Sequence, residues 1–192
     1  MMLEPLTAPA AEPVSLSEMR AHLRLDTLEE DAPLADAIVA ARAFVEARTA
    51  RALIDQVFRL TLDAWPDDGV LRLPRGPVSS VTSVAVRDAE GTAQPLVPAD
   101  WMLEARAHPA RLWAAPGKVW PRPGQRFSGI EVTFVAGYGP EPDDVPAPLR
   151  QAVRLLAAWF FEQRVVDAPI SGPVGEIVAA LIAPFRLPRV FA

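Results

Sequence analysis

The spacing of hydrophobic residues predicts helices at both ends of the chain and strands between them. Residues 16–25 carry apolar side chains at helical spacing, and either Ser15 or Ser17 can cap the first turn. After a second helical stripe the period changes to two, which is the period of a strand with one buried face. Helical spacing returns near Pro148, at the start of the apolar stripe 149–160. The pattern therefore predicts the order α, β, α.

The second helical stripe predicts a longer helix. It begins after Asp31 and Pro33, which favour a first turn, and its spacing continues to about Arg51. The same spacing places Arg42 and Glu46 one turn apart. We expect this pair on the exposed side of the helix.

Alternating polar and apolar residues predict a set of short strands. Phe58, Leu60 and Leu62 share one face of the first strand, and polar side chains occupy the other face. Residues 88–91 have the composition of a hairpin turn. Further strands are expected at 70–73, through 84–86, at 101–104, at 111–114 and at 130–135.

The composition is that of a folded chain with an unusual number of prolines. Of 192 residues, 51% are hydrophobic and 22% charged, which allows a substantial core in one domain or two small ones. The chain has 21 prolines, and 13 of them lie between Pro66 and Pro148. Because proline is confined to the edges and ends of sheets, this distribution predicts short strands and no long continuous sheet.

We therefore predict an α+β fold. The N- and C-terminal helices form a helical bundle, a small antiparallel β module is inserted between them, and the C-terminal tail is extended. Within one structural domain overall, the predicted segments are a flexible N-terminus (1–14), N-terminal helices (15–54), the inserted β module (55–136), a linker (137–148), C-terminal helices (149–183) and a C-terminal arm (184–192).

No residue pattern supports a catalytic, cofactor or metal site. The chain has no cysteine, which excludes disulfides, thiol nucleophiles and cysteine-bearing zinc sites. Its two histidines, His22 and His108, lack a second ligand at helical spacing. The acidic pairs at 67–68 and 143–144 stand beside proline or glycine, as turn residues do, and 137–139 lacks the lysine and third glycine of a phosphate loop. We expect a protein that is not an enzyme and binds no cofactor.

Two regions of opposite charge stand out from a net charge of −5. Residues 105–126 carry five cations, no acid and two tryptophans, whereas residues 1–36 carry eight acids and two arginines. These regions suit a groove for single-stranded nucleic acid, a pair of complementary surfaces that join copies of the chain, or no more than solvated loops. The overall acidity favours protein partners. The candidate inter-subunit charge contacts are Arg106, Arg111, Lys118, Arg122, Arg126, Glu29, Glu30 and Asp31.

The sequence shows no targeting segment. Residues 1–13 lack the basic and apolar parts of a secretory signal. The longest apolar runs, 155–161 and 177–185, are shorter than the roughly 18 residues that a membrane span needs. We expect a cytoplasmic protein without a membrane partner.

Four segments, taken in order, resemble a known family. They are PVSLSEMRAHLRL (13–25) with the acidic 29–31, the run 38–53 that continues into 54–65, VAGYG (135–139) leading to 145–146, and 149–164 with Trp159 and EQR at 162–164, closing on LIAPFR (181–186). This ordered set covers the chain from about residue 14 to residue 186. It resembles the head-tail connector (adaptor) proteins of long-tailed bacteriophages and of phage-derived gene transfer agents.

The resemblance implies a structural protein. Such adaptors form a ring, generally of twelve copies, that docks beneath the portal at the capsid vertex and presents the next surface to the tail. The genome passes through the central channel. The implied partners are other copies of the chain, the portal and a tail-side stopper or tail terminator protein, with DNA only as passing cargo. The implied location is the neck of a virion or phage-like particle that assembles in the bacterial cytoplasm.

The C-terminal tail is the candidate portal-binding arm. In the family this segment commonly reaches toward the portal, and Pro184 and Pro188 prevent the tail from simply extending a helix. A partner-binding arm and a disordered terminus are both open on these residues. The candidate arm residues are Phe185, Arg186, Leu187, Arg189, Val190 and Phe191.

Two hypotheses from other functional classes remain open. The first is a nucleic-acid-binding module that uses the basic residues of 105–126, for which salt-sensitive DNA binding is the expected sign. The second is a small hydrolase, which requires a set of active-site residues that we do not find in the sequence.

Overall fold

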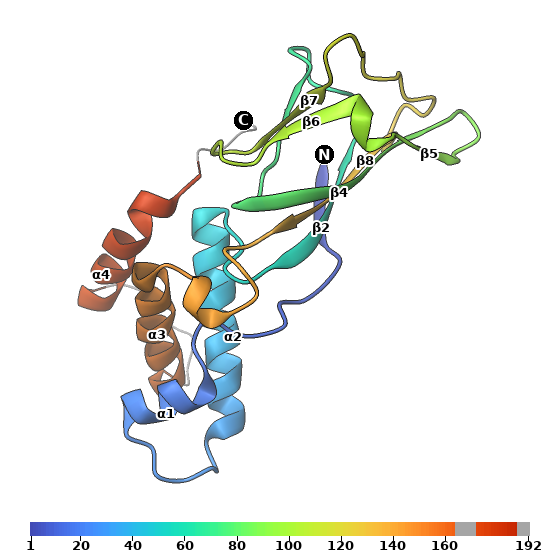
Figure 1. The fold of residues 1–192 in the computed structure, drawn as a ribbon. Coiled ribbons are helices and arrows are strands. Elements are labelled where there is room, and N and C mark those ends of the chain that lie inside the picture. Colours follow the sequence, from blue (N-terminus) through green and yellow to red (C-terminus); the bar gives the residue numbers. More distant parts are fainter. Residues whose placement is uncertain (164–171, 188–192) are drawn as a thin grey trace. The chain divides into compact units, whose positions relative to one another are not determined.

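The computed structural model describes residues 1–163 and 172–187 and has an α+β fold (Figure 1). This part of the chain contains four α-helices and two antiparallel sheets. It separates into two compact units. The β unit comprises residues 1–8, 55–137 and Leu187, and the helical unit comprises the described residues of 9–54 and 138–186. The predicted α+β class is confirmed, while the division into six segments of one domain stays a prediction.

The helical unit is held together by the apolar stripes of its helices. It contains α1 (Leu16–Leu23), α2 (Asp31–Thr49), α3 (Ala147–Glu162) and α4 (Pro173–Ile182), with 3₁₀ turns η2 (Pro142–Asp144) and η3 (Ala183–Phe185). Helix α3 packs against both α2 and α4. The buried core includes Met19, Leu34, Leu149, Leu156 and Ile182, one or more from each helix. Helices α1, α2 and α3 therefore bury the stripes that their sequence spacing predicts.

Ser15 is the residue that caps α1. Its hydroxyl accepts a hydrogen bond from the backbone N–H of Glu18, and the Glu18 carboxylate accepts one from the backbone N–H of Ser15, which completes a capping box. The hydrogen bond from the Ser15 backbone is the main cause of a lowered pKa at Glu18. Arg150 of α3 donates to the same carboxylate at 2.7 Å. The cap therefore also connects α1 to α3.

Glu46 is buried and Arg42 half-buried, so the expectation that they lie on the exposed side of the helix is wrong. Each side chain is only 12% exposed. The Glu46 carboxylate accepts hydrogen bonds from Arg42 and from the backbone N–H of Leu53, both at 2.8 Å. Arg42 also donates to Glu12, whose pKa is raised by burial. The difference arises because the chain after α2 returns to this face and brings a backbone donor that needs an acceptor.

The β unit consists of a five-stranded and a three-stranded antiparallel sheet. Its strands are β1 (Met2–Pro5), β2 (Gln56–Leu62), β3 (Val70–Arg72), β4 (Val78–Arg87), β5 (Ala93–Pro95), β6 (Trp101–Glu104), β7 (Arg111–Ala114) and β8 (Ile130–Ala136), with a 3₁₀ turn η1 (Pro98–Asp100) before β6. The strand orders are β1-β2-β8-β4-β5 and β3-β7-β6. The central strand β8 places Phe134 opposite Phe58 of β2, and the two rings stack with centroids 5.8 Å apart.

Residues 1–14 were expected to form a flexible N-terminus, but the structure places strand β1 within them. It pairs antiparallel with β2 and places Leu3 opposite Leu60. Beyond β1, the backbone N–H of Val57 donates to the hydroxyl of Thr7 at 2.9 Å. The free edge of β2 offers unpaired backbone groups, and such an edge recruits a strand without requiring a strong local pattern.

The two edge strands of the larger sheet both end in proline. Pro5 closes β1, and Pro95 closes β5, which is the other strand that the spacing of hydrophobic residues did not predict. All three residues of β5 are exposed, so no alternation marks it in the sequence. Proline lacks a backbone N–H and is tolerated at such edges. One further backbone hydrogen bond follows each proline, from Leu6 to Val57 at 2.7 Å and from Leu96 to Val84 at 2.8 Å.

We expect Glu46→Ala to lower the free energy of unfolding by about 2–4 kcal/mol. The substitution leaves the N–H of Leu53 without its acceptor and removes one of the two carboxylates that bind the Arg42 guanidinium, the other being Glu12. Urea unfolding measures the change. Glu46→Gln keeps an acceptor for Leu53 and should cost less, and Glu90→Ala at an exposed turn should change the value by less than about 0.5 kcal/mol. Equal values for Glu46→Ala and Glu90→Ala would contradict the proposed role of Glu46.

Candidate functional site

The basic loop, residues 105–126, is held in the β unit by two stacked tryptophans. The ring centroids of Trp65 and Trp120 are 4.0 Å apart, and the rings are 8° from parallel. Their indole N–H groups donate to the backbone oxygens of Pro121 and Gly69, each at 2.9 Å. The loop therefore has a defined conformation that sets the direction of its charged side chains.

All five cations of the basic loop are exposed, but two are paired with acids of the same unit. A guanidinium nitrogen of Arg111 lies 2.7 Å from Glu104, and the ammonium of Lys118 lies 2.8 Å from Asp100. Exposed pairs of this kind add little stability, but they neutralise charge. The cations that have no ion pair to a described residue are Arg106, Arg122 and Arg126.

Two large apolar side chains project from the same part of the β unit. Val119 is 88% exposed and Phe127 is 67% exposed. The guanidinium of Arg126 lies over the Phe127 ring, 5.3 Å from its centroid. A surface that combines exposed apolar groups with unpaired cations is typical of a protein-binding patch.

The acidic candidates lie at the beginning of α2 in the helical unit. Glu29 is exposed in the loop between α1 and α2, and Glu30 is half-buried next to it. Asp31 lies in the first turn of α2, where the helix dipole favours a carboxylate, and it is 3.6 Å from Arg20. The acidic and basic candidates therefore belong to different units.

The first half of the candidate arm continues the helical unit. Phe185 ends η3 and packs, half-buried, against the helical core. Its backbone oxygen accepts a hydrogen bond from Nε of Arg51 at 2.6 Å. The predicted arm begins at residue 184, but in the structure Phe185 is still part of the packed helical unit. The candidates Arg189, Val190 and Phe191 lie outside the described residues.

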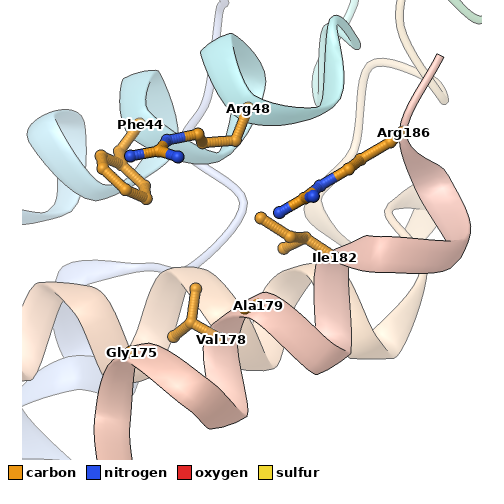
Figure 2. Close-up of a pocket in the computed structure, with 7 residues that line it drawn as sticks. All are labelled: Phe44, Arg48, Gly175, Val178, Ala179, Ile182 and Arg186. Atoms are coloured by element: carbon orange, nitrogen blue, oxygen red, sulfur yellow. The ribbon is translucent and has the colours of Figure 1, made fainter. Parts of the chain in front are cut away.

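A cleft between α2 and α4 is a surface that sequence reasoning missed (Figure 2). It has a volume of about 340 Å³. Phe44 and Arg48 of α2 line one side, and the Arg48 guanidinium lies 4.9 Å from the centroid of the Phe44 ring. On the other side, Figure 2 shows the side chain of Arg186 extending over Ile182 of α4. Because these residues come from distant parts of the chain, no local pattern predicts the cleft. It is also lined by Val178 and Ala179.

The described residues show no arrangement for metal chemistry. Nowhere in 1–163 or 172–187 do three or more histidines, cysteines or acids gather in a way that could hold a metal ion. His22 and His108 are both exposed. Asp143 belongs to one of the acidic turn pairs, and its carboxylate forms an ion pair with Arg150 at 2.6 Å. A search of the same residues for a helix long and apolar enough to cross a bilayer also finds none.

Known proteins resemble the chain over its whole length. The family model for phage gp6-like head-tail connector proteins matches residues 13–94. A chain in the neck of an empty GTA particle, computed with C6 symmetry, is 39% identical, with a TM-score of 0.85 over 100% of this chain and 98% of that chain. The chain belongs to the head-tail connector family.

Two further solved structures resemble the connector to the same degree. A chain in the neck of a native GTA particle, computed with C12 symmetry, is 37% identical, and a chain in the virion of a native gene transfer agent (GTA) particle is 38% identical. Both have a TM-score of 0.82 over 100% of the connector and 98% of the other chain. No curated protein matches the connector.

Family membership confirms the resemblance that the sequence showed. The connector is a structural protein of a virion and not an enzyme. The basic loop, the acidic start of α2 and the cleft are candidate surfaces for contacts with other proteins. The roles of the individual charge contacts and of the arm stay predictions.

Proposed function

We propose that the connector forms a ring in the neck of a gene transfer agent or a related phage-like particle and joins the head to the tail. The main support is the similarity of the whole chain, at 37–39% identity, to chains from the necks of such particles. Those necks were computed with C6 and C12 symmetry, and a ring of twelve copies is compatible with both.

In the proposed assembly the ring docks beneath the portal, and its other side meets a tail-side stopper or tail terminator protein. DNA passes through the channel as cargo. The helical unit, arranged as a bundle, makes the contacts of the ring, and the arm beyond η3 reaches toward the portal. The particle assembles in the bacterial cytoplasm.

We also place exposed charges of both units at contacts with neighbouring proteins of the neck. Copies around a ring meet through heterologous contacts, in which two different surfaces of the chain face each other. Opposite charges give such contacts their orientation and their rate of formation. Arg122 and Arg126 of the basic loop support this assignment, because both are exposed and neither is paired with a described acid.

The alternative function, a nucleic-acid-binding module built on the basic loop, has less support. Ion pairs with Glu104 and Asp100 neutralise two of its five cations. The neighbouring exposed Val119 and Phe127 favour a protein partner. Salt-sensitive DNA binding by the isolated connector would favour the alternative.

Electron microscopy of particles made with and without the connector tests the proposed function. We expect particles with the connector to show a ring between portal and tail, at a position that is empty in tail-less heads made without it. Normal tailed particles in the absence of the connector would overturn the proposal.

The charge contacts are tested by reversing Arg122 and Arg126 to Glu together. If the basic loop meets an acidic neighbour, we expect about a tenfold loss of tailed particles, because two attractive contacts become repulsive in every subunit. The neutral pair Arg122→Gln and Arg126→Gln should give an intermediate loss. Normal particle numbers from the reversed variant would rule out this contact.

The arm is tested by ending the chain after Leu187. This keeps Phe185 and its hydrogen bond to Arg51, so the helical unit should fold as before. We expect weaker binding to the portal, measured by co-sedimentation, and no loss when only Ala192 is removed. Unchanged portal binding by the shortened chain would contradict the arm.

A further inference from the structure

The cleft between α2 and α4 combines an apolar floor with two unpaired positive charges. Val178 and Ile182 are each only 2% exposed and close its base. Arg48 and Arg186 are exposed at its rim, no acid lines it, and neither arginine has an ion pair to a described residue. The cleft therefore suits a group in which an apolar side chain stands next to carboxylates.

Three other hollows of the described residues lack this combination. In the β unit, one hollow is lined by Arg72 and Arg111, and another by Lys118, but all three cations are paired with acids. In the helical unit, an apolar hollow beside Trp159 is lined by Asp36 and contains no cation. Among these four hollows, the cleft has the lining that best suits an anionic group.

The loop between α1 and α2 presents the complementary chemistry. Leu28 is 67% exposed, which is unusual for a leucine in a polar loop. Its neighbours Asp26 and Glu29 are also exposed. The loop thus offers one projecting apolar side chain with a carboxylate on either side. A volume of about 340 Å³ is at the small end of binding pockets, and it suits one side chain better than a whole helix.

The loop of one chain cannot fill the cleft of the same chain. The loop leads into Asp31, the first residue of α2, whereas Phe44 lies thirteen residues further along the same helix. At the rise of an α-helix this separation is about 20 Å. Within the helical unit, Figure 1 shows the α1–α2 loop at one end of α2 and the last turn of α2 at the other. An α1–α2 loop that enters the cleft therefore comes from another copy of the chain.

We propose that Leu28 of one connector inserts into the cleft of the neighbouring connector, with Asp26 and Glu29 facing Arg48 and Arg186. This inference rests on the proposed ring, which places a second copy next to every cleft. The loop and the cleft are different surfaces of one unit, so the contact is heterologous and repeats from copy to copy until the ring closes. It gives the acidic segment a partner in the helical unit and leaves the basic loop available for another neck protein.

Disulfide cross-linking tests the contact directly, because the connector has no cysteine of its own. We combine Leu28→Cys with Ala179→Cys, which lies exposed in the lining of the cleft. Two cysteines form a disulfide only when their Cα atoms are within about 7 Å. Oxidised particles should give a ladder of covalent multimers on a non-reducing gel. Each single variant should stay monomeric, and so should Leu28→Cys with Ala43→Cys, an exposed position of α2 outside the lining.

The microscopy of the same particles separates failure of the contact from failure of the proposed function. If the micrographs show the ring but the double-cysteine variant runs as a monomer on the gel, the loop-in-cleft contact is overturned and the proposed function stands. The same result is expected if the cleft binds a small anion or another protein instead of the loop. The absence of any connector ring overturns the proposed function, and the contact with it.

A charge exchange provides a second test that needs no cysteine. Arg48→Glu and Glu29→Arg should each reduce ring-bearing particles by about tenfold, because like charges then meet at every contact. Both changes in one chain restore opposite charges and should return the number to within about twofold of the unmodified connector. A double variant no better than the single variants, with unfolding midpoints unchanged, would contradict the contact.

Discussion

The arrangement of the helical unit depends on the hydrogen bonds of the buried Glu46 carboxylate. It accepts the backbone N–H of Leu53 and the guanidinium of Arg42, and so holds the segment that follows α2 against the helix. In that segment Arg51 donates to the backbone oxygen of Phe185, which positions the chain after α4. The segment after α2 is therefore bonded both to α2 and to the chain that follows α4. A buried charge tolerates little displacement, because its loss of solvation is offset only by well-placed partners.

The two units present their charges in different ways. In the β unit, the stacked Trp65 and Trp120 hold the basic loop through one hydrogen bond to its backbone and one from it to Gly69, so its arginines project from a fixed frame. In the helical unit, the charges lie at helix ends and on the rim of a cleft. Each arrangement combines a rigid support with exposed charge, which is how a protein keeps a binding surface in place without a buried active site.

In the proposed ring a connector binds other copies of itself and its neighbours at once, and exposed apolar groups beside charges suit this requirement. Apolar contact supplies affinity, while the surrounding charges select the orientation. Two sites show this combination with opposite charges: the exposed Leu28 stands between acids, and the exposed Phe127 stands beside Arg126. Surfaces of opposite sign disfavour contacts between two identical patches, which would give closed pairs in place of rings.

The sequence by itself determined the family, the helices and six of the eight strands, while β1 and β5 escaped it. Helical spacing located the helices, turn residues located the hairpin at 88–91, and the strands at 101–104 and 111–114 have the bounds that alternation predicted. These features depend on neighbours within a few positions, where side-chain spacing and backbone preferences act. Tertiary structure decided the burial of Glu46, the pairing of β1 and the cleft that joins Arg48 to Arg186. Each of these brings together groups that are distant in the chain, and a local pattern carries no information about which distant group will supply the missing partner.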